Sequence, residues 1–327
     1  MAIALVTGAA GHLGANLVRA LLAAGHSVRA LVHRDQRGLA GTAAEIVHGD
    51  VTDPGSLVAA ATGCDWVFHC AARIQLDGQE PEQLRAINLD GTRNVIAACR
   101  ATGVSRLIHV SSIEALDPVP VDAAVDESRP LAARPLMPYA VTKVAADRAV
   151  RAAIADGLDA VILYPTAMLG PEDHVPSHAG SFLLDLARGS LPALVTGGFD
   201  WVDVRDVARG AVAAAERAAA GDRFLLGGHW ASAAAVADIV CAHTGARRPP
   251  VLPRVLAWVS LPFAAAWSTI SGAAPRFTRG SLSALAHYRE VEHHYATERL
   301  GYAPRALALT LTETIDWLLE HHRDRTA

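Results

Sequence analysis

Short apolar runs alternate with amphipathic segments over the first half of the chain. Six runs have the length and composition of buried strands: Ile3–Val6, Val28–Val32, Glu45–His48, Trp66–Cys70, Leu107–Val110 and Ala160–Tyr164. Between them, apolar residues follow helical spacing in four segments: Leu13–Ala24, Gly55–Ala61, Pro81–Ala101 and Tyr139–Asp156. Such alternation is typical of a parallel sheet with helices on both faces. We therefore predict an α/β fold with a Rossmann-type, doubly wound parallel sheet.

After Pro165 the pattern becomes irregular, because prolines and glycines interrupt it at short intervals. We predict a dinucleotide-binding Rossmann domain over residues 1–165 and a smaller, mostly helical substrate-binding lobe over residues 166–327. Some exchange of chain between the two is expected. Within the lobe, residues 255–275 carry no charge and are long enough for a transmembrane candidate. They also contain proline, glycine and several hydroxyl side chains, so we predict a buried or lid helix, with membrane contact as the alternative.

Composition narrows the classes of partner. The chain has 327 residues and a formal net charge of −4, without a basic stripe that would indicate nucleic-acid binding. Its four cysteines are far apart and show no metal-ligand spacing, which indicates a reducing compartment and no metal site. The apolar N-terminus lacks the basic region of a signal peptide. We expect a cytoplasmic protein that acts on a small molecule. A homodimer is the oligomeric state that we consider for it.

A glycine-rich turn follows the first predicted strand. Thr7-Gly8-Ala9-Ala10-Gly11-His12-Leu13-Gly14 leads from that strand directly into a helix. The first glycine allows a tight turn, the second lets a pyrophosphate approach the backbone, and the third lets the helix pack on its strand. The helix N-terminus then offers free amides to the phosphates. Cofactor contacts are predicted for Thr7, Gly8, Gly11, His12, Leu13 and Gly14.

The end of the second strand bears on the choice of cofactor. NAD enzymes usually place an acid there, but this chain has His33 and Arg34, which suit the 2′-phosphate of NADP. We therefore predict NADP as the preferred cofactor, with NAD as the alternative. Asp50 and Val51 follow the third strand, where Asp50 either faces the adenine or caps a turn.

Tyr139 and Lys143 lie four residues apart at the start of a predicted helix and so share one face. A phenol has a pKa near 10, which a nearby ammonium and a positive nicotinamide ring would lower. Tyr139 could then exchange a proton with a substrate oxygen as hydride moves. Of the 29 basic residues, Lys143 is the only lysine. A lysine retained in so arginine-rich a chain is a candidate for chemistry that arginine cannot perform.

Two serines end the fifth predicted strand, at the sheet edge where a cofactor would bind. Ser112 is predicted to hold and polarise the substrate oxygen beside Tyr139. Ser111 either contacts the cofactor or only finishes the strand. Ser112, Tyr139 and Lys143 are thus the predicted catalytic residues, and Tyr139 and Lys143 also contact the cofactor.

The chain resembles the extended short-chain dehydrogenase/reductase family, the epimerase/dehydratase superfamily. The matching motifs are Thr7-Gly8…Gly11…Gly14, Asp50-Val51, Cys70-Ala71-Ala72, Asn88-Leu89-Asp90-Gly91-Thr92, Ser111-Ser112, Tyr139…Lys143, Tyr164-Pro165-Thr166, Trp201-Val202-Asp203-Val204-Arg205-Asp206 and Leu300-Gly301-Tyr302. The resemblance implies a Rossmann domain with a small substrate domain and the catalytic set named above. It also implies cofactor contacts from Ala71, Ala72, Pro165 and Thr166, and a supporting role for Asn88.

Within that family the chain is most similar to the dihydroflavonol 4-reductase-like and 3β-hydroxysteroid dehydrogenase-like branch. It lacks the arginines that nucleotide-sugar enzymes carry before the Trp201 and Leu300 motifs. We predict an oxidoreductase for an apolar ketone, aldehyde or secondary alcohol. A nucleotide-sugar epimerase or dehydratase and a non-catalytic dinucleotide sensor are the alternatives. Substrate contacts are predicted for Arg73, Ser112, Ile113, Met168, His174 and His178.

Overall fold

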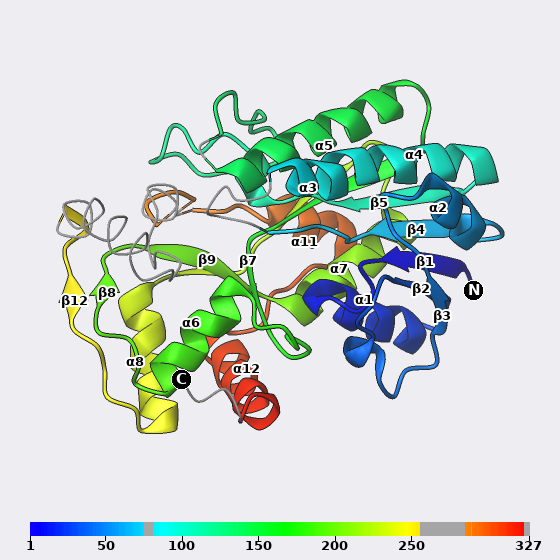
Figure 1. The fold of residues 1–327 in the computed structure, drawn as a ribbon. Helices are drawn as coiled ribbons and strands as arrows, with labels where there is room; N and C mark the ends of the chain where they lie inside the picture. Colours follow the sequence, from blue (N-terminus) through cyan, green and yellow to red (C-terminus); the bar gives the residue numbers. More distant parts are fainter. Residues whose placement is uncertain (75–80, 136, 256–284, 289, 324–327) are drawn as a thin grey trace.

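A seven-stranded parallel sheet forms the centre of the protein (Figure 1). The computed structural model describes residues 1–74, 81–135, 137–255, 285–288 and 290–323. The sheet has the strand order β10-β6-β5-β4-β1-β2-β3. Its strands are β1 (Ile3–Thr7), β2 (Ser27–Val32), β3 (Glu45–His48), β4 (Trp66–His69), β5 (Arg106–Val110), β6 (Ala160–Pro165) and β10 (Arg223–Leu226). The predicted α/β class and all six predicted strands are confirmed.

Helices cover both faces of this sheet. On one face α2 (Pro54–Ala61), α4 (Gly91–Thr102) and α5 (Pro138–Ala155) pack side by side. On the other, α1 (His12–Ala23) packs against α7 (Val204–Arg217), with α11 (His294–Leu300) beside α7. The strands are apolar on both sides because both faces are covered. Since β10 and α7 come from the second half of the chain, residues after 165 complete this layered core.

The segment Pro81–Ala101, predicted as one helix, is interrupted. It consists of α3 (Pro81–Arg85), a π-helical turn η2 (Ala86–Asp90) and α4. Within this turn the Asn88 side chain accepts from the Arg73 backbone N–H at 2.8 Å and donates to the Arg73 carbonyl at 2.9 Å. A π turn is a local insertion that often lies at functional sites. Here it brings the Asn88 amide to the chain that leaves β4.

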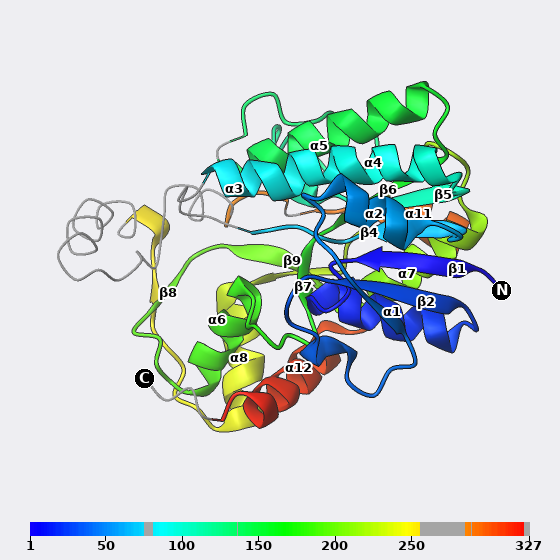
Figure 2. The ribbon, with the colours of Figure 1, turned by 45° about the vertical axis from the view of Figure 1, so that its right-hand side comes forward.

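The smaller C-terminal region is both helical and stranded. A three-stranded sheet joins β7 (Ala167–Leu169), β9 (Gly198–Asp203) and β11 (His229–Ser232), and β8 (Leu194–Val195) pairs with β12 (Val251–Leu252). Around them pack α6 (His178–Ala187), α8 (Ala233–Thr244) and α12 (Leu307–His321) (Figure 2). The sequence predicted a mostly helical lobe. It missed these strands because most of them are too short to show an alternating pattern.

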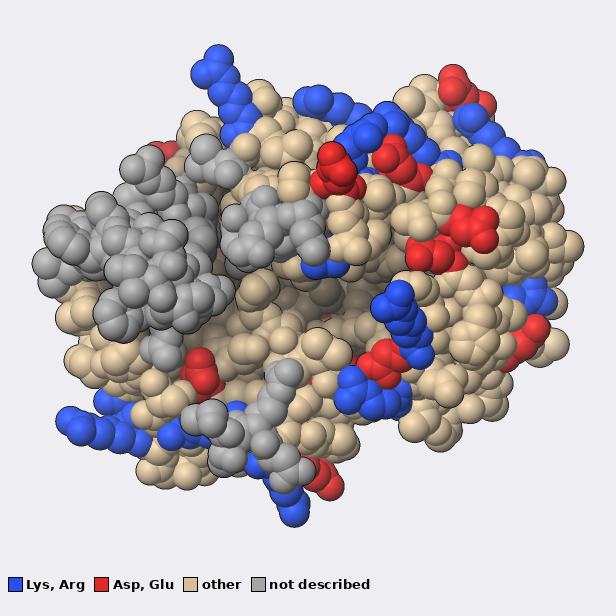
Figure 3. Space-filling view, viewed as in Figure 1, with Lys and Arg blue, Asp and Glu red and all other residues tan. Residues whose placement is uncertain are grey.

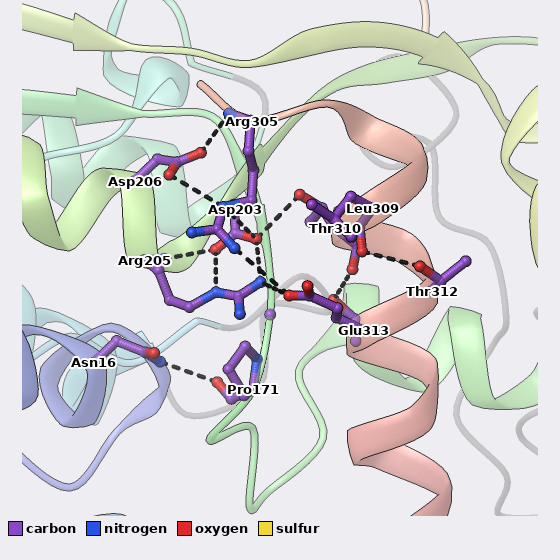
Figure 4. Close-up of polar contacts among 12 residues, drawn as sticks. Asn16, Pro171, Asp203, Arg205, Asp206, Arg305, Leu309, Thr310, Thr312 and Glu313 are labelled. Carbon is purple, nitrogen blue, oxygen red and sulfur yellow. Dashed lines mark hydrogen bonds and ion pairs between the residues drawn. The ribbon is translucent and has the colours of Figure 1, made fainter. Parts of the chain in front are cut away.

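A partly buried ion cluster around Asp203 joins this region to the central layers (Figure 4). Asp203 caps α7, accepting from the Arg205 backbone N–H at 2.9 Å, and its carboxylate lies 2.7 Å from the Arg205 guanidinium. Thr310 of α12 donates to the same carboxylate at 3.0 Å, and Arg305 and Glu313 complete the cluster. Burial alone would raise the pKa of Asp203, but its arginine partners lower it overall. The corner between β9 and α7 is thereby fixed to the C-terminal helix.

No helix in the described ranges is long and apolar enough to cross a membrane. The predicted buried or lid helix falls almost entirely within residues 256–284, outside the described residues.

Candidate active site

A cleft of about 1310 Å³ opens along the carboxyl ends of the central strands. It passes the point between β1 and β4 where the strand order reverses, the usual ligand position in such sheets. The cleft continues toward the C-terminal region, which supplies residues from β9 and α6 to its walls. Figure 3 shows it as a hollow in the middle of the face, with mainly uncharged walls.

The glycine turn has the geometry predicted for a phosphate loop. Gly8 has φ +65°, and a Cβ built there would lie 2.8 Å from the Ala71 Cα. A Cβ on Gly14 would lie 2.1 Å from the Gly8 carbonyl oxygen, so only glycine lets α1 approach so closely. Gly8, Gly11, His12, Leu13 and Gly14 all line the cleft. The N-terminus of α1 thus faces the place where a diphosphate would bind.

Thr7, in contrast, does not line the cleft. Its hydroxyl contacts His69 Nδ1 at 2.8 Å and accepts from the Ala71 backbone N–H at 3.3 Å. The side chain is fully buried and joins β1 to β4. The predicted cofactor contact of Thr7 is therefore replaced by a supporting contact beneath the loop.

The part of the cleft next to the ends of β2 and β3 carries the residues that were predicted to contact the adenosine half of the cofactor. His33, Arg34, Asp50 and Val51 all line it. Asp50 accepts from the Thr52 backbone N–H at 2.9 Å and lies 3.4 Å from His33 Nε2. Burial alone would raise the pKa of Asp50, but the bonds from Thr52 and the nearby basic groups lower it. Asp50 thus both caps a turn and faces the cleft.

Ser112, Tyr139 and Lys143 meet in the middle of the cleft. Ser112 follows β5, whereas Tyr139 and Lys143 lie on the first turns of α5, and all three line the cavity. The Ser112 hydroxyl is close enough to the Tyr139 phenol to lower its pKa. The Lys143 ammonium donates to the Val110 carbonyl at 2.8 Å and lies 5.9 Å from the centre of the Tyr139 ring. A serine, a phenol and an ammonium are therefore held together by two neighbouring elements.

Burial sets the protonation of this group. It raises the pKa of Tyr139, while the nearby Ser112 hydroxyl lowers it by a smaller amount. It also lowers the pKa of Lys143 to about 8. The sequence predicted a lowered pKa for Tyr139. That prediction was for the ammonium together with a bound nicotinamide ring, whereas in the protein alone burial is the largest influence on the pKa of Tyr139 and raises it. The protein alone holds Tyr139 as a neutral phenol.

Buried hydrogen bonds hold in place the segments that carry Ser112, Tyr139 and Lys143. The Ser111 hydroxyl, at the cleft wall, donates to Asp147 Oδ2 at 3.0 Å, which ties β5 to α5. Asp147 is fully buried and also accepts from Arg151 at 2.5 Å. Asn88 donates to the Thr142 hydroxyl at 3.0 Å, consistent with the supporting role that the resemblance implied. These contacts fix the position of α5 relative to β5.

A nicotinamide dinucleotide fits these residues. Lys143 has three N–H donors, and in the described part of the chain only the Val110 carbonyl accepts one. The other two face a cleft that is also lined by the remaining residues predicted to contact the cofactor, namely Ala71, Ala72, Ser111, Pro165 and Thr166. The ribose hydroxyls of a bound dinucleotide would satisfy those donors.

The predicted substrate contacts are only partly brought together. Arg73, Met168 and His178 line the cleft, as does Ser112. Ile113 is 6% exposed and belongs to the core, because the short helix η3 (Ile113–Ala115) turns its side chain inward. His174 packs against Trp317 and Glu172 instead of lining the cavity. Neither position therefore supplies the contact that the sequence predicted.

The cleft also has walls that the sequence did not single out. Glu114 lines it two residues after Ser112. The remaining residues are mainly apolar: Met137, Phe182, Leu191, Leu194, Val195, Phe199, Trp201 and Leu285. They come from separate segments that only the fold brings together. In the described chain, no group of three or more His, Cys, Asp or Glu side chains is arranged to hold a metal.

The sheet, the glycine turn and the Ser–Tyr–Lys group together are those of a nicotinamide-dinucleotide-dependent oxidoreductase. Residues 4–227 match the model of the NAD dependent epimerase/dehydratase family, to which the chain belongs. The sterol demethylase protein B of Methylococcus capsulatus is 32% identical over 97% of this chain and 98% of its own length. The crystal structure of gox2253 has a TM-score of 0.88 and 32% identity, with 99% of both chains covered.

A third relative is the 3 beta-hydroxysteroid dehydrogenase/Delta 5-->4-isomerase of Mycobacterium tuberculosis, 36% identical over 52% of this chain and 48% of its own length. The family resemblance drawn from the sequence is thus confirmed. The chain is an NAD(P)-dependent reductase or dehydrogenase of the extended short-chain type.

Proposed function

We propose that the protein reduces an apolar ketone or aldehyde with NADPH, or oxidises the matching alcohol, with Tyr139 as the acid or base. The observation that carries this proposal is the placement of Ser112, Tyr139 and Lys143 in one cleft with mainly apolar walls. The bound dinucleotide supplies or accepts the hydride.

The roles of the three residues follow from their positions. Ser112 holds and polarises the substrate oxygen, since its hydroxyl lines the cleft close to the Tyr139 phenol. Tyr139, kept neutral by burial, donates its proton to that oxygen in the reductive direction. Lys143 keeps two N–H donors for the ribose, and its charge stabilises the phenolate left after proton transfer.

The substrate end of the cleft supports an apolar compound. Met137, Phe182, Phe199 and Trp201 contribute its walls, and in the described lining the only guanidiniums belong to Arg34 and Arg73. A sugar diphosphate would require bidentate arginine partners near the substrate. The name of the Methylococcus relative refers to a sterol, which is also largely apolar.

NADPH as the preferred cofactor rests on His33 and Arg34, which line the adenosine end. Among the described residues there, Asp50 is the acid in the lining, and it is engaged by Thr52 and His33. A 2′-phosphate would find basic partners at this end.

The proposal is tested by NADPH and NADH oxidation with medium-chain ketones, steroid ketones, aromatic aldehydes and nucleotide sugars. We expect turnover of an apolar carbonyl, and Tyr139→Phe should reduce it by about 100-fold or more at nearly unchanged NADPH affinity. Tyr295→Phe, which alters a tyrosine outside the cleft lining, is the matched control. Turnover of nucleotide sugars alone, or a Tyr139→Phe variant with more than about a tenth of the wild-type rate, would refute the proposal.

A further inference from the structure

Glu114 places a carboxyl group in the apolar cleft. It lies in η3, two residues after Ser112, and its backbone N–H donates to the Ser112 hydroxyl at 3.2 Å. Its half-buried side chain lines the cavity together with Ser112 and Tyr139. Among the residues that the structure describes, its carboxyl oxygens have no hydrogen-bond or ion-pair partner. A carboxyl group without a protein partner in a mainly apolar wall can therefore form a hydrogen bond with a ligand.

The surroundings of Glu114 favour its neutral form. Burial raises its pKa to about 7, and in the described chain no cation offsets that effect. The titratable groups near it are Tyr139 from α5 and Tyr288, whose phenols burial also keeps neutral. Asp117 and Arg129, which act on Tyr288 as well, complete the charged groups at this corner. A neutral carboxyl donates a hydrogen bond, whereas the ionised form can only accept one.

We propose that Glu114 selects the substrate by donating a hydrogen bond to a second oxygen, close to the carbonyl that is reduced. Once Glu114 is ionised, the same group disfavours a carboxylate at that place, because two like charges would then share an apolar wall. This inference rests on the proposed carbonyl reduction. It deepens that proposal by naming the substrate class as an uncharged carbonyl compound with a nearby hydrogen-bond acceptor.

Three matched probes test the inference: a medium-chain methyl ketone, the same ketone with a methoxy group two carbons from the carbonyl, and the β-keto acid of equal length. The methoxy oxygen accepts a hydrogen bond but cannot donate one. In the wild type we expect kcat/KM for the methoxy ketone to exceed that for the plain ketone by roughly tenfold, with the acid poorest. This preference should be greatest at about pH 5 and decline as the pH rises through about 7, where Glu114 loses its proton.

Two variants separate the possible outcomes. Glu114→Leu should bring kcat/KM for the methoxy ketone down to that for the plain ketone. Glu114→Gln should keep the preference and lose its pH dependence, since an amide donates at any pH. An unchanged preference in Glu114→Leu overturns the role of Glu114 and leaves the reductase proposal intact. If Glu114→Leu also loses activity on the plain ketone, the pH profile of Glu114→Gln decides. A preference for the methoxy ketone that declines with pH in Glu114→Gln as it does in the wild type overturns the role of Glu114. Failure to reduce any ketone refutes the reductase proposal itself.

Discussion

At the scale of one residue, the composition of the chain and the geometry of the cleft both indicate that position 143 requires lysine. Every other basic position in the chain is arginine, so a positive charge alone would not require lysine. In the structure this side chain is buried among Val110, Tyr139 and Asp147, and it donates to a backbone carbonyl. A compact ammonium can bond that carbonyl and still offer two donors to a ribose. A guanidinium is wider, planar and rigidly forked.

Lys143→Arg is therefore expected to reduce turnover by on the order of 100-fold, since a displacement of about 1 Å at a reacting group has that effect. The measurement compares kcat and NADPH affinity with wild type, after circular dichroism has shown an unchanged fold. Arg148→Lys, at an exposed position of the same helix, is the control and should leave both values unchanged. Wild-type turnover in Lys143→Arg would mean that the lone lysine is an accident of composition.

The residues that sequence could assign are those with a local signature. Gly8, Gly14 and the pair Tyr139 and Lys143 are marked by spacing within one turn or one helix, and the structure brings them into the cleft. Glu114 has no such signature, because the sequence does not show that its carboxyl faces an apolar cavity. Ile113 was predicted to contact the substrate because it follows Ser112 in the sequence. Its side chain lies in the core instead, because the sequence position does not determine the direction in which η3 turns it.

At the scale of elements, the long strands and helices of the sheet could be predicted because both faces of the sheet impose a clear period. The two-residue strands β8 and β12 have no period to detect. The π turn around Asn88 depends on a contact with Arg73, 15 residues away, so it interrupts a sequence that is helical by local pattern. These elements are set by tertiary contacts rather than by local preference.

The ion cluster at the start of α7 makes a prediction about stability. Asp203→Ala removes the cap of α7 and one of the two carboxylates that Arg205 and Arg305 share, which leaves Glu313 as the other. Because both arginines remain paired with Glu313, we expect the loss of the cap and of the Asp203 hydrogen bonds to cost about 2 kcal/mol of unfolding free energy. Urea unfolding followed by circular dichroism measures the change. Asp238→Ala, which breaks an exposed pair with Arg248, should leave the midpoint nearly unchanged; equal midpoints for both variants would contradict the prediction.

At the scale of the whole molecule, the cleft joins two chemically different ends. The adenosine end lies at the carboxyl ends of β1 and β2, with His33 and Arg34, and the apolar end is formed with α6 and β9 of the C-terminal region. The sheet brings these ends together, and the Ser112 and Tyr139 side chains lie between them. A dinucleotide bound along the cleft would therefore present its nicotinamide to a substrate held partly by the second region.

The preference for NADPH is the prediction that depends on this whole arrangement. Arg34 lines the adenosine end, so it can meet a 2′-phosphate only if the cofactor lies along the cleft with its pyrophosphate at the glycine turn. A hydrogen bond to a charged group contributes about 1.5–3 kcal/mol, so Arg34→Ala should weaken NADPH binding roughly tenfold or more. NADH binding should barely change, because NADH has no phosphate there. Fluorescence titration measures both affinities.

Arg37→Ala is the matched control, because Arg37 is engaged with Asp35 on the same loop and does not line the cleft. It should leave both affinities near wild type. Cofactor binding to the folded state also raises the melting temperature, so NADPH should raise that of the wild type more than NADH at equal concentration, and Arg34→Ala should remove the difference. A wild type that binds NADH more tightly would contradict the assignment of His33 and Arg34. An equal loss of both cofactors in Arg34→Ala would instead place this arginine at the pyrophosphate, which both cofactors share.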